Sequence, residues 1–311
     1  MTLPREFRRL RVLLLGFGDI AQRLARQQLA KPSSLHGPRL IAVSRSKANT
    51  NPELLRALRK QRSAWLAWDL DQRLFVDRLA RVGQVSLVFF PPADPQGSVN
   101  DTRAQNLARA IRKAPNPMPM VYLSTTGVYG NREGGRVNET TTCRPGQARS
   151  RRRLHAEQTL RALNAHVLRV PGIYAHDRLP TARLAAQTPV LAQQEDVYTN
   201  HIHAEDLARI TWAAAFRGRC ARITNAVDET EMTMGEYFDT VAEALKLPKP
   251  PRVSMKEMQA LAQQGAISAM ALSFFSESRK VESARLSKEL RITLRYPRVG
   301  DCLRELTANT P

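Results

Sequence analysis

The sequence has only three cysteines, no long apolar run and far fewer acidic than basic residues. Cys143, Cys220 and Cys302 lie far apart without a CxxC pair, so neither a disulfide framework nor a zinc site is expected. No stretch approaches the roughly 18 apolar residues that a membrane span requires. The apolar run behind the N-terminal arginines is also too short for a signal peptide, and Asp19 interrupts it. We expect a cytoplasmic protein with no metal and no membrane partner.

The shortage of acidic residues leaves a formal net charge of +20, from 48 Lys and Arg against 28 Asp and Glu. Basic patches bind the phosphate backbone of nucleic acids. The arginines are spread along nearly every expected helix, however, and no helix-turn-helix, zinc finger or aromatic-rich RNA-binding motif concentrates them. Solvated helix faces therefore explain the charge better, and polyanion binding is the weakest functional alternative.

The stretch from residue 12 to residue 21, VLLLGFGDIA, has the pattern of a dinucleotide-binding turn. An apolar run without polar alternation is typical of a buried parallel strand, and helical spacing follows it. Gly16 would permit the tight turn, Gly18 would let the backbone approach a pyrophosphate, and Ala21 is the small packing position. A tight turn in any α/β core is the alternative interpretation. The expected cofactor contacts here are Gly16, Phe17, Gly18, Asp19 and Ile20.

The second apolar strand, at 40–43, ends in Ser44, Arg45 and Ser46. An acidic residue at this point would accept from the ribose 2′-hydroxyl of NAD, whereas an arginine accommodates the 2′-phosphate of NADP. The strand end offers Arg45 and no carboxylate, and the neighbouring serine hydroxyls could add donors. We therefore expect NADP as cofactor, with NAD as the alternative and an ordinary surface arginine as the other interpretation.

Strands and helices alternate through the first half of the chain. Apolar runs at 65–68, 85–90 and 120–123 are interleaved with helical patterns at 52–62, 72–81 and 103–113. This alternation predicts an α/β fold with a doubly wound parallel sheet, whose ligand crevice lies at the carboxyl ends of the strands. Candidate residues at those ends are Gly16, Arg45, Asp69, Pro91 and Thr125. We expect a Rossmann core at 1–175 and, at 176–311, a mixed region that completes the core and forms a smaller substrate lobe.

Four segments, GFGDIA, WDL, YLSTTGVYG and NHIHAEDLA, make the chain resemble the extended short-chain dehydrogenase/reductase superfamily of nucleotide-sugar epimerases, dehydratases and reductases. The resemblance covers about residues 10 to 300. It implies an NAD(P)-binding Rossmann domain, with Asp69 and Leu70 near the adenine and Pro91 and Pro171 among the cofactor contacts. It also implies that Thr125 polarises a substrate carbonyl.

The chain departs from this superfamily at its proton-transfer pair. Members carry a Tyr-xxx-Lys pair after the VYG motif; aligned on Glu157, this chain has Arg149 at the tyrosine position and Arg153 at the lysine position. A guanidinium stays protonated at any working pH, so neither can exchange a proton. Arg153 could bond a ribose or phosphate and Arg149 could clamp an anionic substrate, unless the run is only a solvated basic helix face.

Few residues could replace the missing proton donor. His155 is expected to point away from the face that carries the two arginines, Tyr174 could be a packing residue, and His201 and His203 are expected to be structural. The sequence therefore predicts an NADP(H)-binding oxidoreductase or epimerase-type enzyme that acts on a small molecule. The alternative is a catalytically silent protein that senses NADP(H) and reports it to a partner.

Overall fold

A computed structural model describes residues 10–31, 37–47, 50–72, 86–90, 99–114 and 119–308. Its centre is a seven-stranded sheet in the order β12-β7-β5-β4-β1-β2-β3, and all six pairs of neighbouring strands are parallel. The strands are β1 (Arg11–Leu15), β2 (Arg39–Ser44), β3 (Ala64–Ala67), β4 (Ser86–Phe89), β5 (Met120–Thr125), β7 (His166–Val170) and β12 (Ile223–Asn225). This sheet confirms the predicted α/β fold, and its strand order reverses between β1 and β4, where α/β proteins bind ligands.

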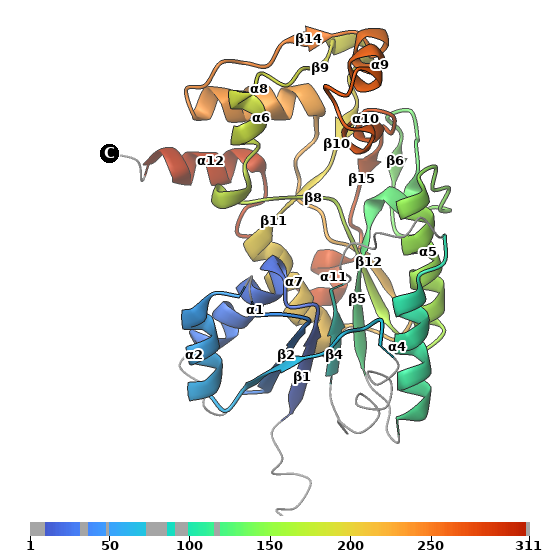
Figure 1. Cartoon of the computed structure of the whole chain (residues 1–311), viewed down its shortest axis with the longest axis vertical. Helices are drawn as coiled ribbons and strands as arrows, with labels where there is room; N and C mark the ends of the chain where they lie inside the picture. Colours follow the sequence, from blue (N-terminus) through green and yellow to red (C-terminus); the bar gives the residue numbers. More distant parts are fainter. Residues whose placement is uncertain are drawn as a thin grey trace, which may run out of the picture.

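Helices cover both faces of the sheet (Figure 1). One face carries α1 (Asp19–Leu29), α2 (Pro52–Lys60), α7 (Ala204–Arg217) and α11 (Leu286–Leu290), and the other carries α4 (Thr102–Lys113) and α5 (Ala148–Arg161). Successive side chains of a strand point to opposite faces, so Leu14 packs in the first layer and Leu13 and Leu15 in the second. The continuous apolar run of β1 is explained by this burial on both sides.

A smaller C-terminal lobe lies above the carboxyl ends of the strands (Figure 1). Its helices are α6 (Thr181–Ala185), α8 (Met234–Ala244), α9 (Met255–Gln263), α10 (Ala269–Phe274) and α12 (Val299–Ala308). Capping boxes begin two of them: Thr233 pairs with Glu236 at α8, and Ser254 pairs with Glu257 at α9. The lobe has its own apolar core, which includes Phe238 and Met258.

Short strands pair within the lobe and where the lobe meets the sheet domain. They form the pairs β8 (Gly172–Tyr174) with β11 (His201–His203), β10 (Tyr198–Thr199) with β13 (Met232–Thr233), β9 (Val190–Leu191) with β14 (Arg252–Val253), and β6 (Arg136–Val137) with β15 (Lys280–Val281). The remaining elements are single 3-10 turns, η3 (Thr126–Tyr129), η4 (His176–Arg178) and η5 (Gln193–Glu195).

The sheet uses residues from both sides of the expected boundary at 175, because β12 from the C-terminal region pairs with β7 at the sheet edge. The helix predicted at 72–81 falls almost entirely outside the described residues. None of the described helices has the length and apolarity needed to cross a membrane.

Candidate functional site

A cavity of about 600 Å³ opens at the carboxyl ends of the central strands. Residues that the sequence predicted as a site line it together: Gly16, Phe17, Gly18, Asp19, Ile20, Ser44, Arg45, Asp69, Leu70, Thr125, Arg153 and Pro171. Pro91 lies outside the described residues. The fold thus brings to one place side chains that are up to 155 positions apart in the sequence, and we call this space the first cavity.

The two glycines of the strand-to-helix turn have different structural roles. Gly16 has a φ of +88°, and a Cβ there would lie 2.1 Å from the Phe90 carbonyl oxygen, so the turn requires glycine. Gly18 precedes α1 in extended backbone, and a Cβ there would meet nothing within 4 Å. Open space therefore lies beside the first amides of α1, where a helix attracts an anion.

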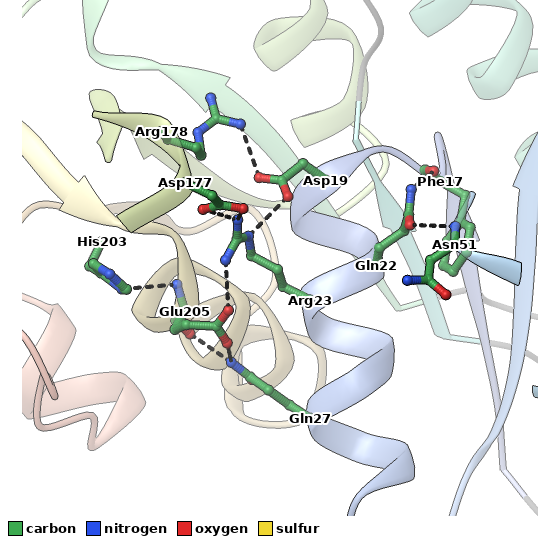
Figure 2. A network of polar contacts seen from close by, with 10 residues as sticks. All are labelled: Phe17, Asp19, Gln22, Arg23, Gln27, Asn51, Asp177, Arg178, His203 and Glu205. Atoms are coloured by element: carbon green, nitrogen blue, oxygen red, sulfur yellow. Dashed lines mark hydrogen bonds and ion pairs between the residues drawn. The ribbon is translucent and has the colours of Figure 1, made fainter. Parts of the chain in front are cut away.

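Asp19, the first residue of α1, belongs to an ion network that joins the sheet domain to the lobe (Figure 2). Its carboxylate accepts from Arg23 Nε at 2.9 Å and from Arg178 Nη1 at 2.9 Å. The buried Arg23 also donates to both oxygens of Asp177, at 2.6 and 2.5 Å, and to Glu205 at 2.9 Å. Burial alone would lower the pKa of Arg23, but the bonds to Asp177 and Glu205 raise it above its usual value. The charge of Asp19 is therefore compensated beside the space for an anion.

The end of β2 presents Arg45 to the first cavity, while Ser44 is already hydrogen-bonded. The Ser44 hydroxyl accepts from Trp65 Nε1 at 2.9 Å and donates to the Ser46 carbonyl at 2.9 Å. Its single proton is thus in use, so Ser44 could donate to a phosphate only if its bond to Ser46 broke.

A carboxylate from the next strand end lies within electrostatic reach of Arg45. The pKa of Asp71 is lowered mainly by its hydrogen bonds with Arg103, at 2.8 and 2.7 Å, and also by the charge of Arg45. The sequence did not predict this neighbour, because Asp71 lies in the turn after β3 and Arg45 follows β2. The bidentate bond to Asp71 engages Arg103, which lines the first cavity together with Arg45 and Arg153.

A second cavity, of about 660 Å³, shares Thr125, Arg153, Pro171 and Ile173 with the first and extends under the lobe. Thr125 therefore lies where the two cavities meet. Its hydroxyl accepts from the Gly127 amide at 3.1 Å as the cap of η3. This bond uses a lone pair and leaves the hydroxyl proton available to a substrate oxygen.

The two arginines at the positions of the Tyr-xxx-Lys pair both face the cavities. Arg153 lines both of them, and Arg149 lines the second. The Arg149 guanidinium stacks on the Phe274 ring at 4.6 Å and donates to Ser273 Oγ at 2.7 Å, which connects α5 to α10. Both residues are half-buried, whereas Arg151 in the same run is exposed and fits the interpretation as a solvated face.

The candidate proton donors are separated by the fold. His155 lines neither cavity, and its Nδ1 accepts from the Asp101 amide at 3.2 Å. Burial lowers the pKa of His201 to about 3 and that of His203 to about 4, so both rings are neutral near pH 7. They lie on β11, which pairs with β8 and joins the lobe to the core. Tyr174 is buried at the edge of the second cavity.

Two features of the site region were missed from the sequence. Arg169 on β7 and Glu157 on α5 form a buried ion pair, and Arg183 lines the second cavity. A lone charge in an apolar strand, such as Arg169 in HVLRV, could have signalled a buried partner. Nothing in the sequence distinguishes Arg183 from the other arginines. Within the described part of the chain, His, Cys, Asp and Glu form no group of three that could hold a metal ion.

No protein-family model matches the chain, and no curated protein matches it. Several solved structures do match the chain. A functionally unknown conserved protein from Silicibacter pomeroyi shares 28% identity over 96% of this chain and 98% of that one, with a TM-score of 0.71. A putative NAD-dependent epimerase/dehydratase from Methylobacillus flagellatus shares 22% sequence identity over 96% of this chain and 98% of that one, with a TM-score of 0.69. A dTDP-glucose 4,6-dehydratase from Streptomyces venezuelae with NAD bound shares 17% over 96% of each chain, with a TM-score of 0.74. The fold is that of NAD-dependent epimerase/dehydratase structures.

Proposed function

We propose that this chain is an NADP(H)-dependent oxidoreductase or epimerase-type enzyme that acts on a small carbonyl or carbinol compound. The observation that carries the proposal is the open space at Gly18, beside the first amides of α1 and inside a cavity lined by the residues expected to hold a dinucleotide. A bound nicotinamide would supply or accept the hydride. The three unpaired cysteines suit a reducing cytoplasm.

The chain's own residues would bind and orient the reactants. Thr125 lies where the cavities meet and has a proton to donate, so it would hold the substrate oxygen. Arg153 lines both cavities and would contact the ribose or a phosphate. Neither Arg153 nor Arg149 can donate a proton in catalysis, so the acid would be water or another group.

The absence of a catalytic proton donor at these positions supports a second candidate function, a catalytically silent protein that senses NADP(H). Arg149 contacts Ser273 and Phe274 of α10 and so connects the cavity wall to a lobe helix. It occupies the position where the superfamily has its proton-donating tyrosine. A substrate-dependent change in absorbance of the reduced nicotinamide would identify the enzyme, while cofactor binding without turnover would favour the sensor.

Gly18→Ala should weaken NADPH binding by about tenfold or more, which is roughly 1.4 kcal/mol, without changing the unfolding midpoint. The added methyl would occupy space that the pyrophosphate needs, yet it would meet no atom of the protein within 4 Å. The backbone there is extended, so alanine fits without strain. Isothermal titration calorimetry with NADPH and thermal unfolding measure the two effects.

Gly300→Ala is the matched control, since it adds the same methyl in α12 with the nearest atom at 3.6 Å, away from the first cavity. It should leave NADPH affinity unchanged. If Gly18→Ala binds NADPH as tightly as the wild type, the pyrophosphate does not lie at this turn and the proposed function fails.

Arg45→Ala should weaken NADPH binding about 10- to 150-fold and barely alter NADH binding. A hydrogen bond to a charged group contributes about 1.5–3 kcal/mol, and only NADPH carries the 2′-phosphate. Arg39→Ala removes an equal charge from the opposite end of the same strand and should affect neither cofactor. Calorimetry at fixed salt compares the variants, because a chain of net charge +20 favours the more anionic ligand in any case. An equal loss for both cofactors would make Arg45 an ordinary surface arginine.

A further inference from the structure

Arg183, on α6, is a guanidinium in the second cavity without an anionic partner. Its Nη2 is buried and makes no hydrogen bond, and among the described residues no carboxylate forms an ion pair with it. Within the part of the chain that the structure describes, the guanidinium stacks on the ring of Phe238, 4.7 Å from its central carbon. Burial alone lowers the pKa of Arg183, with no carboxylate to oppose the effect. The folded protein therefore holds this charge at a free-energy cost.

The rest of the second cavity does not compensate this charge. Its acidic lining residue, Glu277, bonds to Arg279 at 2.8 Å, and Arg178 is paired with Asp19. Arg149 makes no ion pair with any residue that the structure describes and, like Arg183, stacks on a phenylalanine. Two guanidiniums in one cavity are thus held by aromatic rings and not by carboxylates. Rings orient a guanidinium and leave its N–H donors for an oxyanion.

We propose that the second cavity binds a substrate that carries an oxyanion, a phosphate or a carboxylate, on the guanidinium of Arg183, with Arg149 as the second cation. The inference rests on the proposed function, because it names the substrate class of that enzyme. An oxyanion would satisfy the buried Nη2 and neutralise the charge. The aromatic rings of Tyr237 and Phe238 would then cover the uncharged part of the molecule.

The test compares wild type with Arg183→Met, whose thioether can replace the guanidinium against Phe238. Calorimetric titrations with inorganic phosphate and with malonate, at fixed ionic strength, distinguish a phosphate site from a carboxylate site. Arg183→Met should weaken the preferred anion about 10- to 150-fold. Without a ligand it should also melt roughly 2 °C or more above wild type, because a half-buried charge with an unbonded, buried Nη2 is removed.

Arg304→Gln is the control for general charge, since this exposed arginine pairs with Asp301 on α12 and lines neither cavity. Its anion affinity should equal that of wild type. Equal anion binding by Arg183→Met, or a lower melting temperature, would overturn the proposal and assign Arg183 to packing. Failure of the wild type to bind NADPH would overturn the proposed function alone, because the anion titrations need no cofactor.

Discussion

Arg169→Met should lower the free energy of unfolding by about 3–5 kcal/mol, because it leaves the carboxylate of Glu157 buried and unpaired. The Arg169 side chain is 3% exposed and that of Glu157 is 1% exposed. Arg169 Nη2 donates to Glu157 Oε2 at 2.8 Å, and its Nε donates to Oε1 at 3.1 Å. The guanidinium also stacks on the Tyr129 ring at 4.7 Å. Urea denaturation of both proteins at pH 7 measures the difference.

The double variant Arg169→Met with Glu157→Leu provides the control. Replacing a whole buried ion pair by apolar side chains is often neutral, so the double variant should recover most of the lost stability. A double variant as unstable as Arg169→Met would show that the loss comes from packing against Tyr129 and not from the unpaired charge.

The sheet could be predicted from the sequence because buried parallel strands give continuous apolar runs. VLLL at 12–15 and LIAV at 40–43 have no polar alternation, and both proved to be central strands with helices on either face. The ends of those strands meet at one edge, so the residues after them could be grouped before the structure was known. The same logic placed Gly16, Arg45 and Thr125 at one crevice, and all three line the first cavity.

The second cavity could not be predicted in the same way. It lies under a lobe built from short helices and two-residue strands whose packing follows no period. Arg183 has a distinct role only because α6 packs beside α8, where Nη2 of the guanidinium is buried and the Phe238 ring stacks on it. With 48 basic residues in the chain, no local pattern separates this arginine from the solvated ones. Likewise, the charge of Arg45 lowers the pKa of Asp71 only because β2 pairs with β3 and brings the ends of the two strands together.

Asp228→Asn should make the protein more stable above neutral pH, by up to about 4 kcal/mol. Burial raises the pKa of Asp228 to about 7 from an ordinary value of 3.8. Its Oδ1 accepts from the Thr230 amide at 2.9 Å, and its Oδ2 makes no hydrogen bond of normal geometry with the described residues, although the Tyr174 side chain acts on the carboxyl. Asparagine keeps the acceptor for Thr230 and carries no charge, so the variant loses the cost of ionising a buried carboxyl.

The stability advantage of Asp228→Asn over wild type should grow as the pH rises. Between about pH 4 and pH 7 the unfolded chain has released the Asp228 proton while the folded chain keeps it, so wild-type stability falls as the pH rises. The lowered pKa values of His201 and His203 act in the opposite direction below pH 6.5, but they are common to both proteins and cancel in the difference. Urea denaturation at a series of pH values should therefore show the advantage of Asp228→Asn growing from pH 4 to pH 7 and constant above. A difference that does not change with pH would mean that Asp228 titrates in the folded protein as it does in water.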